Sequence, residues 1–137
     1  MRLYFCFILS LFSLEAIAQK TTLTVKIEGI KAEEGKILLA LYTREAEFLS
    51  DEIYLGNEAY IQNGKAIFLL ENVPYGVYAI STYFDKNENG ELDTNFLGIP
   101  KEPYGFSMNP ESNFGPPSFD QAAFRLSSPS DTITITY

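Results

Sequence analysis

Residues 77–84 read VYAISTYF, a run in which apolar and aromatic side chains fall on both faces of an extended chain. Successive side chains of a strand point to opposite faces, so a strand that is apolar on both faces is expected inside a sheet. One face would carry Val77, Ala79, Ser81 and Tyr83, and the other Tyr78, Ile80, Thr82 and Phe84. We therefore predict a central strand here, and we expect the buried residues to include Phe68, Leu70, Val77, Ala79 and Ile80.

The segments that precede this run also have the patterns of strands. Residues 21–30, TTLTVKIEGI, alternate between apolar and polar side chains, as a half-buried strand does. Residues 36–43, KILLALYT, are more apolar and indicate a central or doubly buried strand. Residues 59–70, AYIQNGKAIFLL, predict a hairpin, because Asn63-Gly64 is a preferred pair for a two-residue turn. A helical turn is expected around residues 45–49.

The segments that follow the run predict a long loop and then two more strands. Residues 95–119 hold five of the seven prolines and show no period, which indicates an irregular loop. Residues 121–127, QAAFRLS, and 131–137, DTITITY, are expected to pair as a hairpin through SPSD. About seven short strands with regularly spaced turns predict an all-β fold, a single sandwich of immunoglobulin-like or prealbumin-like type with a long loop rich in proline and aromatics.

The N-terminal residues have the three parts of a secretory signal peptide. Arg2 precedes an apolar run over residues 3–14, and Ala16-Ile17-Ala18 forms a small-residue cleavage site. We expect residues 1–18 to be removed, leaving one domain over 19–137 that is exported to the periplasm or the cell exterior. The run is shorter than the roughly 20 residues a membrane-spanning helix needs, so no membrane span is expected in the mature chain. An uncleaved anchor or a buried first strand is the alternative.

Composition restricts the classes of function. Removing Arg2 and Glu15 from 10 basic and 18 acidic residues leaves 9 and 17, so the mature chain keeps a net charge of −8. Without a cluster of Lys or Arg, nucleic acid is not an expected partner. The chain has no histidine, and its one cysteine, Cys6, lies in the signal peptide, so imidazole and thiolate chemistry are not expected. We therefore do not expect an enzyme; a small cell-envelope enzyme that uses carboxylates near an ion is the alternative.

A polar loop follows the central strand directly, at residues 85–93, DKNENGELD. A calcium loop places oxygen ligands at alternate positions, a glycine at the sixth and a backbone carbonyl at the seventh. The matching positions one, three, five, six, seven and nine are Asp85, Asn87, Asn89, Gly90, Glu91 and Asp93. With two ligand carboxylates, we predict weak calcium binding with a dissociation constant of about 0.1–1 mM. The alternative is a metal-free connection built from Asx turns.

The loop departs from the calcium pattern at its twelfth position, where Phe96 replaces the expected glutamate. No helix is predicted on either side, so the loop is not an EF-hand. The remaining ligands would come from backbone carbonyls, water, or side chains such as Asn95, Glu102, Asn109 and Asp120. We expect the loop ligands to be surface side chains whose removal leaves the fold intact.

The long loop carries most of the features that indicate binding. Its aromatic residues are Phe96, Tyr104, Phe106, Phe114 and Phe119. They could form a platform for a protein, a peptide or a glycan of the cell envelope, or they could cover one end of the sandwich as a small second core. We expect most of them to be buried, and we select Tyr104 and Phe106, on either side of Gly105, as the exposed binding candidates.

Residues 73–107, VPYGVYAISTYFDKNENGELDTNFLGIPKEPYGFS, carry a resemblance to a known family. They combine a Pro-x-Gly-x-Tyr-Ala strand, the Asp- and Asn-rich loop, and an Asn-Phe-x-Gly-x-Pro segment. The chain resembles the small exported bacterial proteins grouped as domain of unknown function 2141, over essentially the whole mature chain. The resemblance implies export and a single β-domain, and it implies no catalytic residue. The VPYGVYAI segment is also similar to prealbumin-like and collagen-adhesin-repeat sandwiches, which is an analogy of fold alone.

Overall fold

The computed structural model describes residues 19–111 and 114–137. The predicted signal peptide, residues 1–18, lies outside the described residues. The elements in chain order are β1 (Lys20–Glu28), β2 (Lys36–Tyr42), η1 (Glu45–Glu47), β3 (Leu55–Tyr60), β4 (Ala66–Pro74), β5 (Gly76–Asp85), β6 (Tyr104–Phe106), α1 (Phe119–Ala122), β7 (Phe124–Leu126) and β8 (Ser130–Thr136). No described helix is long and apolar enough to cross a membrane.

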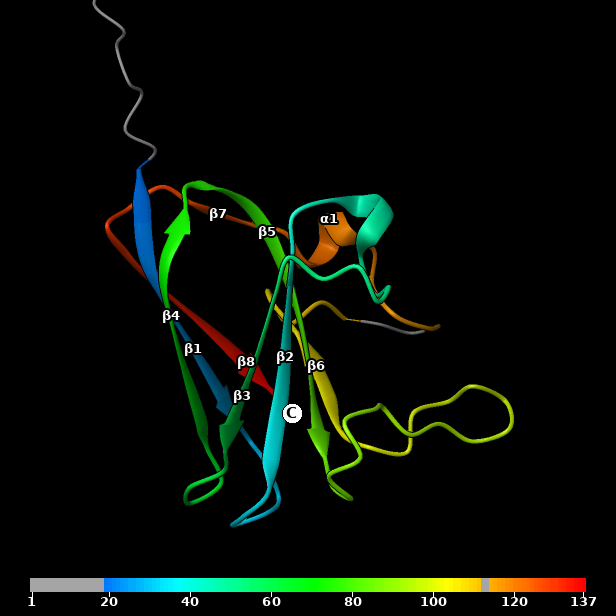
Figure 1. The fold of residues 1–137 in the computed structure, drawn as a ribbon. Helices are drawn as coiled ribbons and strands as arrows, with labels where there is room; N and C mark the ends of the chain where they lie inside the picture. The colour runs from blue at the N-terminus through cyan, green and yellow to red at the C-terminus, as the bar shows by residue number, and fades with distance from the viewer. Residues whose placement is uncertain (1–18, 112–113) are drawn as a thin grey trace, which may run out of the picture.

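Two sheets face each other across one hydrophobic core (Figure 1). The smaller sheet has the order β4-β1-β8, and the larger has the order β3-β2-β5-β6, with β7 paired to the start of β5. Every pairing is antiparallel except that of β1 with β8. The all-β sandwich predicted from the sequence is therefore confirmed, with eight strands among the described residues in place of about seven.

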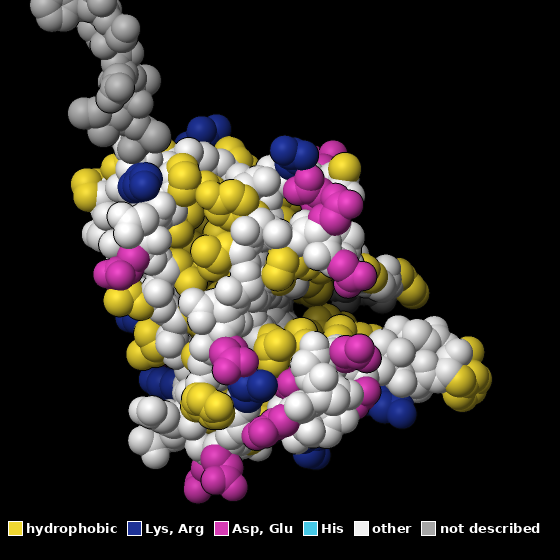
Figure 2. Space-filling model, viewed as in Figure 1, with side chains coloured by type: hydrophobic (Ala, Val, Ile, Leu, Met, Phe, Trp, Pro, Cys, Tyr) yellow, Lys and Arg dark blue, Asp and Glu magenta, His cyan; other side chains and the backbone are white. Residues whose placement is uncertain are grey.

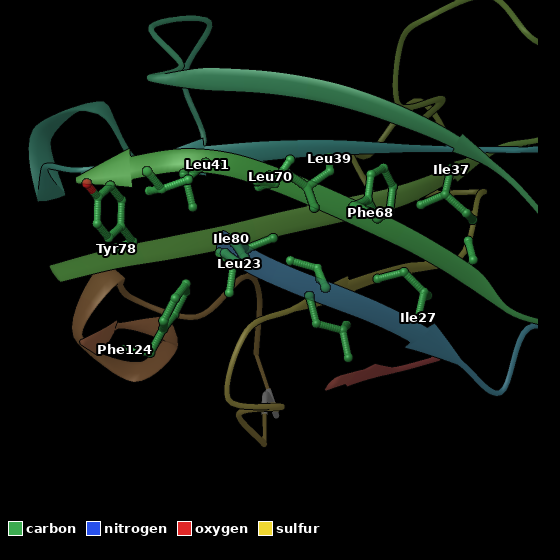
Figure 3. Close-up of a cluster of buried hydrophobic side chains, with 14 of the residues drawn as sticks. Leu23, Ile27, Ile37, Leu39, Leu41, Phe68, Leu70, Tyr78, Ile80 and Phe124 are labelled. Carbon is green, nitrogen blue, oxygen red and sulfur yellow. The ribbon is translucent and has the colours of Figure 1, made fainter. Parts of the chain in front are cut away.

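The main core lies between the two sheets. Leu23, Ile27, Ile37, Leu41 and Ile80 are among its fully buried side chains. Figure 3 shows these residues from both sheets pointing toward one another, together with Phe68, Leu70 and Tyr78. Every second side chain of each strand contributes to this core, because residues two apart in a strand face the same side of the sheet.

β5 is a central strand, as predicted, with β2 on one side and β6 on the other. The predicted core residues Phe68, Leu70, Ala79 and Ile80 are buried, but Val77 is 38% exposed. The prediction for Val77 was wrong, because the outer face of β5 is open to solvent at Val77 and becomes covered at Ala79. There Ala79 packs with α1 in a second cluster, which is made by Tyr42, Ala79, Phe119 and Ala122 with Phe48 and Phe106 against them.

Two predicted hairpins are wrong in their pairing. Asn63 (φ 53°) and Gly64 (φ 73°) do form the tight turn, closed by a bridge between Gln62 and Lys65. The strands beyond the turn then separate, because β3 joins β2 and β4 joins β1 in the opposite sheet. The C-terminal segments do not pair either: β7 joins β5, while β8 lies parallel to β1. Alternation specifies which face of a strand is buried, and it does not specify the neighbouring strand.

The segment QAAFRLS is helical in its first part and not a strand throughout. Ser118 and Gln121 form a capping box at the start of α1, and the strand β7 is confined to residues 124–126. The motif Ser-x-x-Gln was visible in the sequence and is a known helix-start signal. The helical turn expected around residues 45–49 is confirmed as η1.

Candidate functional site

The connection from β5 to β6 is the longest segment outside the two sheets in the described part of the chain. It leaves β5 at Asp85, contains the polar loop over residues 85–93, and returns to β6 at Tyr104. In Figure 1 it projects to the side of the sandwich as the yellow-green segment. The backbone N–H of Phe84 donates to the Pro103 carbonyl (2.8 Å), which fixes the base of the projection on the core.

The side chains at alternate positions of the polar loop turn toward its inside. Both carboxylate oxygens of Asp85 accept backbone N–H groups, Oδ1 from Asn89 (3.1 Å) and Oδ2 from Gly90 (2.9 Å). Asn87 Oδ1 accepts the N–H of Asn89 (3.2 Å), and Asn89 Oδ1 accepts that of Glu91 (2.9 Å). The left-handed backbone at Gly90 (φ 79°) allows the reversal that this requires. The contacts of Asn87 and Asn89 are Asx turns, and with the longer-range bonds of Asp85 they fold the loop inward.

Asp93 closes this inward arrangement. Its carboxylate oxygens accept hydrogen bonds from the side-chain amides of Asn87 (Nδ2 to Oδ2, 2.6 Å) and Asn89 (Nδ2 to Oδ1, 3.3 Å). The sequence positions three, five and nine of the predicted calcium loop are thus in direct contact. Three ion pairs join described residues, and none of them involves a carboxylate of the segment 85–102.

Asp85 is fully buried, at 0% exposure. The expectation that all loop ligands are surface side chains is therefore wrong for this residue. Asp85 is the last residue of β5, where the strand is still covered by its neighbours, and its register partner on β2 is Lys36. A buried carboxylate that accepts two backbone N–H groups supports the fold as well as the loop.

Glu102 holds the two ends of the loop together. This side chain is 6% exposed, and its carboxylate accepts the N–H of Lys86 (2.8 Å) at Oε1 and the N–H of Asp93 (3.0 Å) at Oε2. Glu102 was one candidate for completing the ion's ligands. Both of its oxygens instead serve the backbone of the loop, which it closes from outside.

The other candidate ligands lie in other parts of the structure. Asn95 Oδ1 accepts the N–H groups of Leu97 and Ile99 within its own turn. Asn109 bonds β8, donating to the Thr134 carbonyl and accepting from the Thr136 N–H. Asp120 belongs to α1, and Phe96, at the twelfth loop position, is 94% exposed. Among residues 19–111 and 114–137, no group of three or more His, Cys, Asp or Glu side chains is placed to hold a metal ion.

The tip of the projection is a well-bonded turn with an apolar surface. A bridge joins Thr94 to Pro100, and the Asn95 N–H donates to the Ile99 carbonyl (2.9 Å). Phe96 and Leu97 stand on this turn, and both are largely exposed. They were not among the predicted binding residues, although an apolar pair inside an Asn- and Gly-bounded turn was a signal for an exposed apolar tip.

A groove of about 800 Å³ lies between this projection and the outer face of the larger sheet. Its floor includes Tyr83, Tyr104 and Phe106, and its opposite wall is formed by residues 49–51. Figure 2 shows a cleft on this side of the molecule, with hydrophobic side chains inside it and Asp and Glu side chains above and below its mouth. A second hollow of about 840 Å³, at the end of the sandwich, is lined by Lys31, Lys86 and Lys101 among others.

The expectation that most aromatic residues of the long loop are buried was wrong. Tyr104 and Phe106 contact each other (5.7 Å between ring centroids), and Tyr104 is 42% exposed. Phe106 is partly buried because it also meets Phe48 of the second cluster (6.3 Å), so it is less exposed than expected. Gly105 between them faces inward, where an added Cβ would lie 2.6 Å from Ile135. Phe119 is buried, while Phe96 and Phe114 are exposed.

The phenol of Tyr83 lies on the groove floor beside the polar loop, and this position raises its pKa. Its burial, together with the nearby charges of Asp85, Glu102 and Glu91, raises its pKa to about 12. Tyr83 therefore stays a neutral hydrogen-bonding group at every physiological pH. The pKa of Tyr137 is also raised by burial, although its hydroxyl bonds Thr82 (3.0 Å).

The fold and this site define an exposed Asp- and Asn-rich loop on a two-sheet β-domain, next to an aromatic groove. Residues 25–134 match a family model described as an uncharacterized protein conserved in bacteria, DUF2141. The match covers most of the sequence, and the chain belongs to this family. No match was found among curated proteins or among solved structures.

Proposed function

We propose that the protein is an exported β-sandwich binding module in which calcium, held by the loop over residues 85–93, stabilises one wall of the groove. The observation that carries this proposal is the inward convergence of Asn87, Asn89 and Asp93, on a loop that leads directly into the groove wall. The partner would be a protein, a peptide or a glycan of the cell envelope.

The donor chemistry of the loop fits calcium. Its side chains and the Glu91 carbonyl offer only oxygen ligands, which calcium prefers, and calcium tolerates irregular geometry better than magnesium does. The amides of Asn87 and Asn89 now direct nitrogen toward the Asp93 carboxylate. Rotation about the terminal side-chain bond exchanges the oxygen and nitrogen of an amide. It would direct both oxygens toward the Asp93 side, and the cation would have to offset the loss of the Asx-turn bonds from the N–H groups of Asn89 and Glu91. The surrounding acids, which lack ion-pair partners among the described residues, attract a cation.

A binding role fits the carboxylates better than the alternative role as an envelope enzyme. Asp85 and Glu102, the buried acids beside the loop, each accept two backbone N–H groups. A general acid or base needs a carboxylate that faces the space where a substrate sits. Asp51 and Glu91 do line the groove, in opposite walls, but its floor presents aromatic rings, which are common in binding sites.

Thermal unfolding of the mature protein tests the calcium proposal. Because calcium would bind the folded state, we expect the melting temperature to rise from EDTA to near-millimolar calcium, with a gain of about 1.4 kcal/mol at ten times the dissociation constant. Magnesium should have a smaller effect. Identical melting curves in EDTA and in calcium would show that the loop is only a turn.

Two substitutions distinguish calcium binding by the loop from a general effect of removing a negative charge. Asp93→Ala removes the ligand that contacts both Asn side chains, and its solvent-accessible position lets the fold persist. We expect this variant to lose the calcium response. Asp51→Ala removes an exposed aspartate outside the loop and serves as the matched control, which should keep the response.

A further inference from the structure

We propose that the groove binds a short peptide segment in which a large apolar side chain is flanked by lysine or arginine. This inference deepens the proposed binding function by naming the ligand class, and it rests on that function. Three features of the groove carry it: the charges at its walls, the aliphatic character of those walls, and the polar groups of its floor.

The charges of the groove select against anions. Asp51 lies in one wall and Glu91 in the other, and the described residues that line the groove include no Lys or Arg. Acidic side chains on both sides repel phosphate, sulfate and carboxylate groups, and they attract an ammonium or guanidinium group placed between them. The lysines near the projection, Lys86 and Lys101, line the second hollow at the end of the sandwich.

The walls favour an apolar side chain over a sugar. Leu49 on one side and Leu92, Leu97 and Ile99 on the other line the groove and are all partly or largely exposed. A sugar ring between these walls would place its hydroxyl groups against aliphatic carbon, where they lose hydrogen bonds to water and gain none. A leucine or phenylalanine side chain would instead cover apolar surface on both walls, which is favourable.

The floor supplies partners for a peptide backbone. Tyr83 and Tyr104 are neighbours across β5 and β6, and their rings line the groove. A phenol hydroxyl can donate to a peptide carbonyl or accept from a peptide N–H. Aromatic rings with one polar group also provide large contact areas at small cost in conformational entropy, as in other peptide-binding surfaces.

Titration calorimetry with defined ligands tests the inference. The probes are the blocked peptides Gly-Lys-Phe-Leu-Lys-Gly, Gly-Glu-Phe-Leu-Glu-Gly and Gly-Lys-Ser-Ser-Lys-Gly, together with a linear N-acetylglucosamine oligomer. We expect measurable binding of the first peptide, and at least about tenfold weaker binding of the other three. Equal or tighter binding of the acidic peptide or of the sugar would overturn the inference, as would binding of none of the four.

Matched variants locate the binding. Asp51→Asn with Glu91→Gln removes both wall charges and should weaken the first peptide about fivefold. Glu33→Gln with Glu71→Gln removes two exposed charges elsewhere and should change little. Leu97→Ser should weaken binding, whereas Leu69→Ser, at a similarly exposed position on the outer face of the smaller sheet, should not. Equal effects of each variant and its control would place the binding outside the groove.

The same titrations in EDTA and in calcium separate this inference from the proposed function. A calcium-dependent melting temperature without peptide binding would retain the calcium loop and refute the ligand class. Peptide binding that responds to the groove variants, without any calcium effect, would retain the ligand class and refute the role of calcium.

Discussion

Replacing Glu102 with alanine should release the polar loop from the sandwich while leaving the sheets folded. The Glu102 carboxylate accepts two backbone hydrogen bonds, from Lys86 (2.8 Å) and Asp93 (3.0 Å). A hydrogen bond to a charged group contributes roughly 1.5–3 kcal/mol when buried. Water can reach parts of this loop, so we take about 1 kcal/mol for each bond and about 2 kcal/mol for the pair. Glu102→Gln keeps one acceptor oxygen and should lose about half of this free energy.

Amide hydrogen exchange in EDTA measures this loss locally. A loss of 2 kcal/mol corresponds to exchange about 30-fold faster at Lys86 and Asp93 in the alanine variant, and roughly fivefold faster in the glutamine variant. The Ile80 amide, which donates to the Ser107 hydroxyl (2.9 Å) inside the sandwich, is the internal control and should not change. Glu91→Gln removes an exposed charge from the same loop and should leave both rates within about threefold of the original. If Glu102→Ala also leaves both rates within that range, the two bonds do not hold the loop.

Three further outcomes follow from the fold and the sequence. Ala79→Asp should lower the melting temperature strongly, because an unpaired charge at this fully buried site costs several kcal/mol. Val77→Asp, two residues away and 38% exposed, should be tolerated. Similar melting temperatures for the two variants would contradict the burial argument. In an absorbance titration, Tyr83 should ionise near pH 12, and this transition should be absent from Tyr83→Phe. Because the raised pKa favours the neutral phenol in the folded state, the contribution of Tyr83 to stability is complete below about pH 10 and is lost as the pH rises to about 12. Mass spectrometry of the protein from the cell envelope should find Gln19 at the N-terminus, and an intact peptide containing Arg2 would refute cleavage after Ala18.

The polar loop shows how far local sequence reasoning reaches. The residues Asp85, Asn87, Asn89 and Asp93 were selected from spacing alone, and they do come together, because contacts within nine consecutive residues depend mainly on local backbone geometry. The role of Glu102 was not predictable in this way. It meets the loop from beyond the tip turn, so its place depends on how the whole projection folds back.

The groove was outside the reach of the sequence for a related reason. Its lining residues come from separate parts of the chain, namely Tyr42 and the segments 49–51, 81–83, 90–100, 104–106 and 115–116. Tyr104 was selected correctly as an exposed aromatic. Phe106, however, is partly buried by Phe48, which follows η1 and is far from Phe106 in the chain. No local pattern indicates that contact.

The sequence by itself determined the all-β class, the central position of residues 77–84, the turn at Asn63-Gly64 and the inward-facing loop after Asp85. Each of these depends on side-chain alternation or on the backbone preferences of a few adjacent residues. Only the tertiary structure decided which strands are neighbours, including the separation of β3 from β4 and the parallel pairing of β8 with β1. It also decided the burial of Asp85 and the exposure of Val77. The physical reason is that alternation fixes the buried face of a strand, whereas its neighbours are fixed by contacts between residues far apart in the chain, which compete for the same edges of the two sheets.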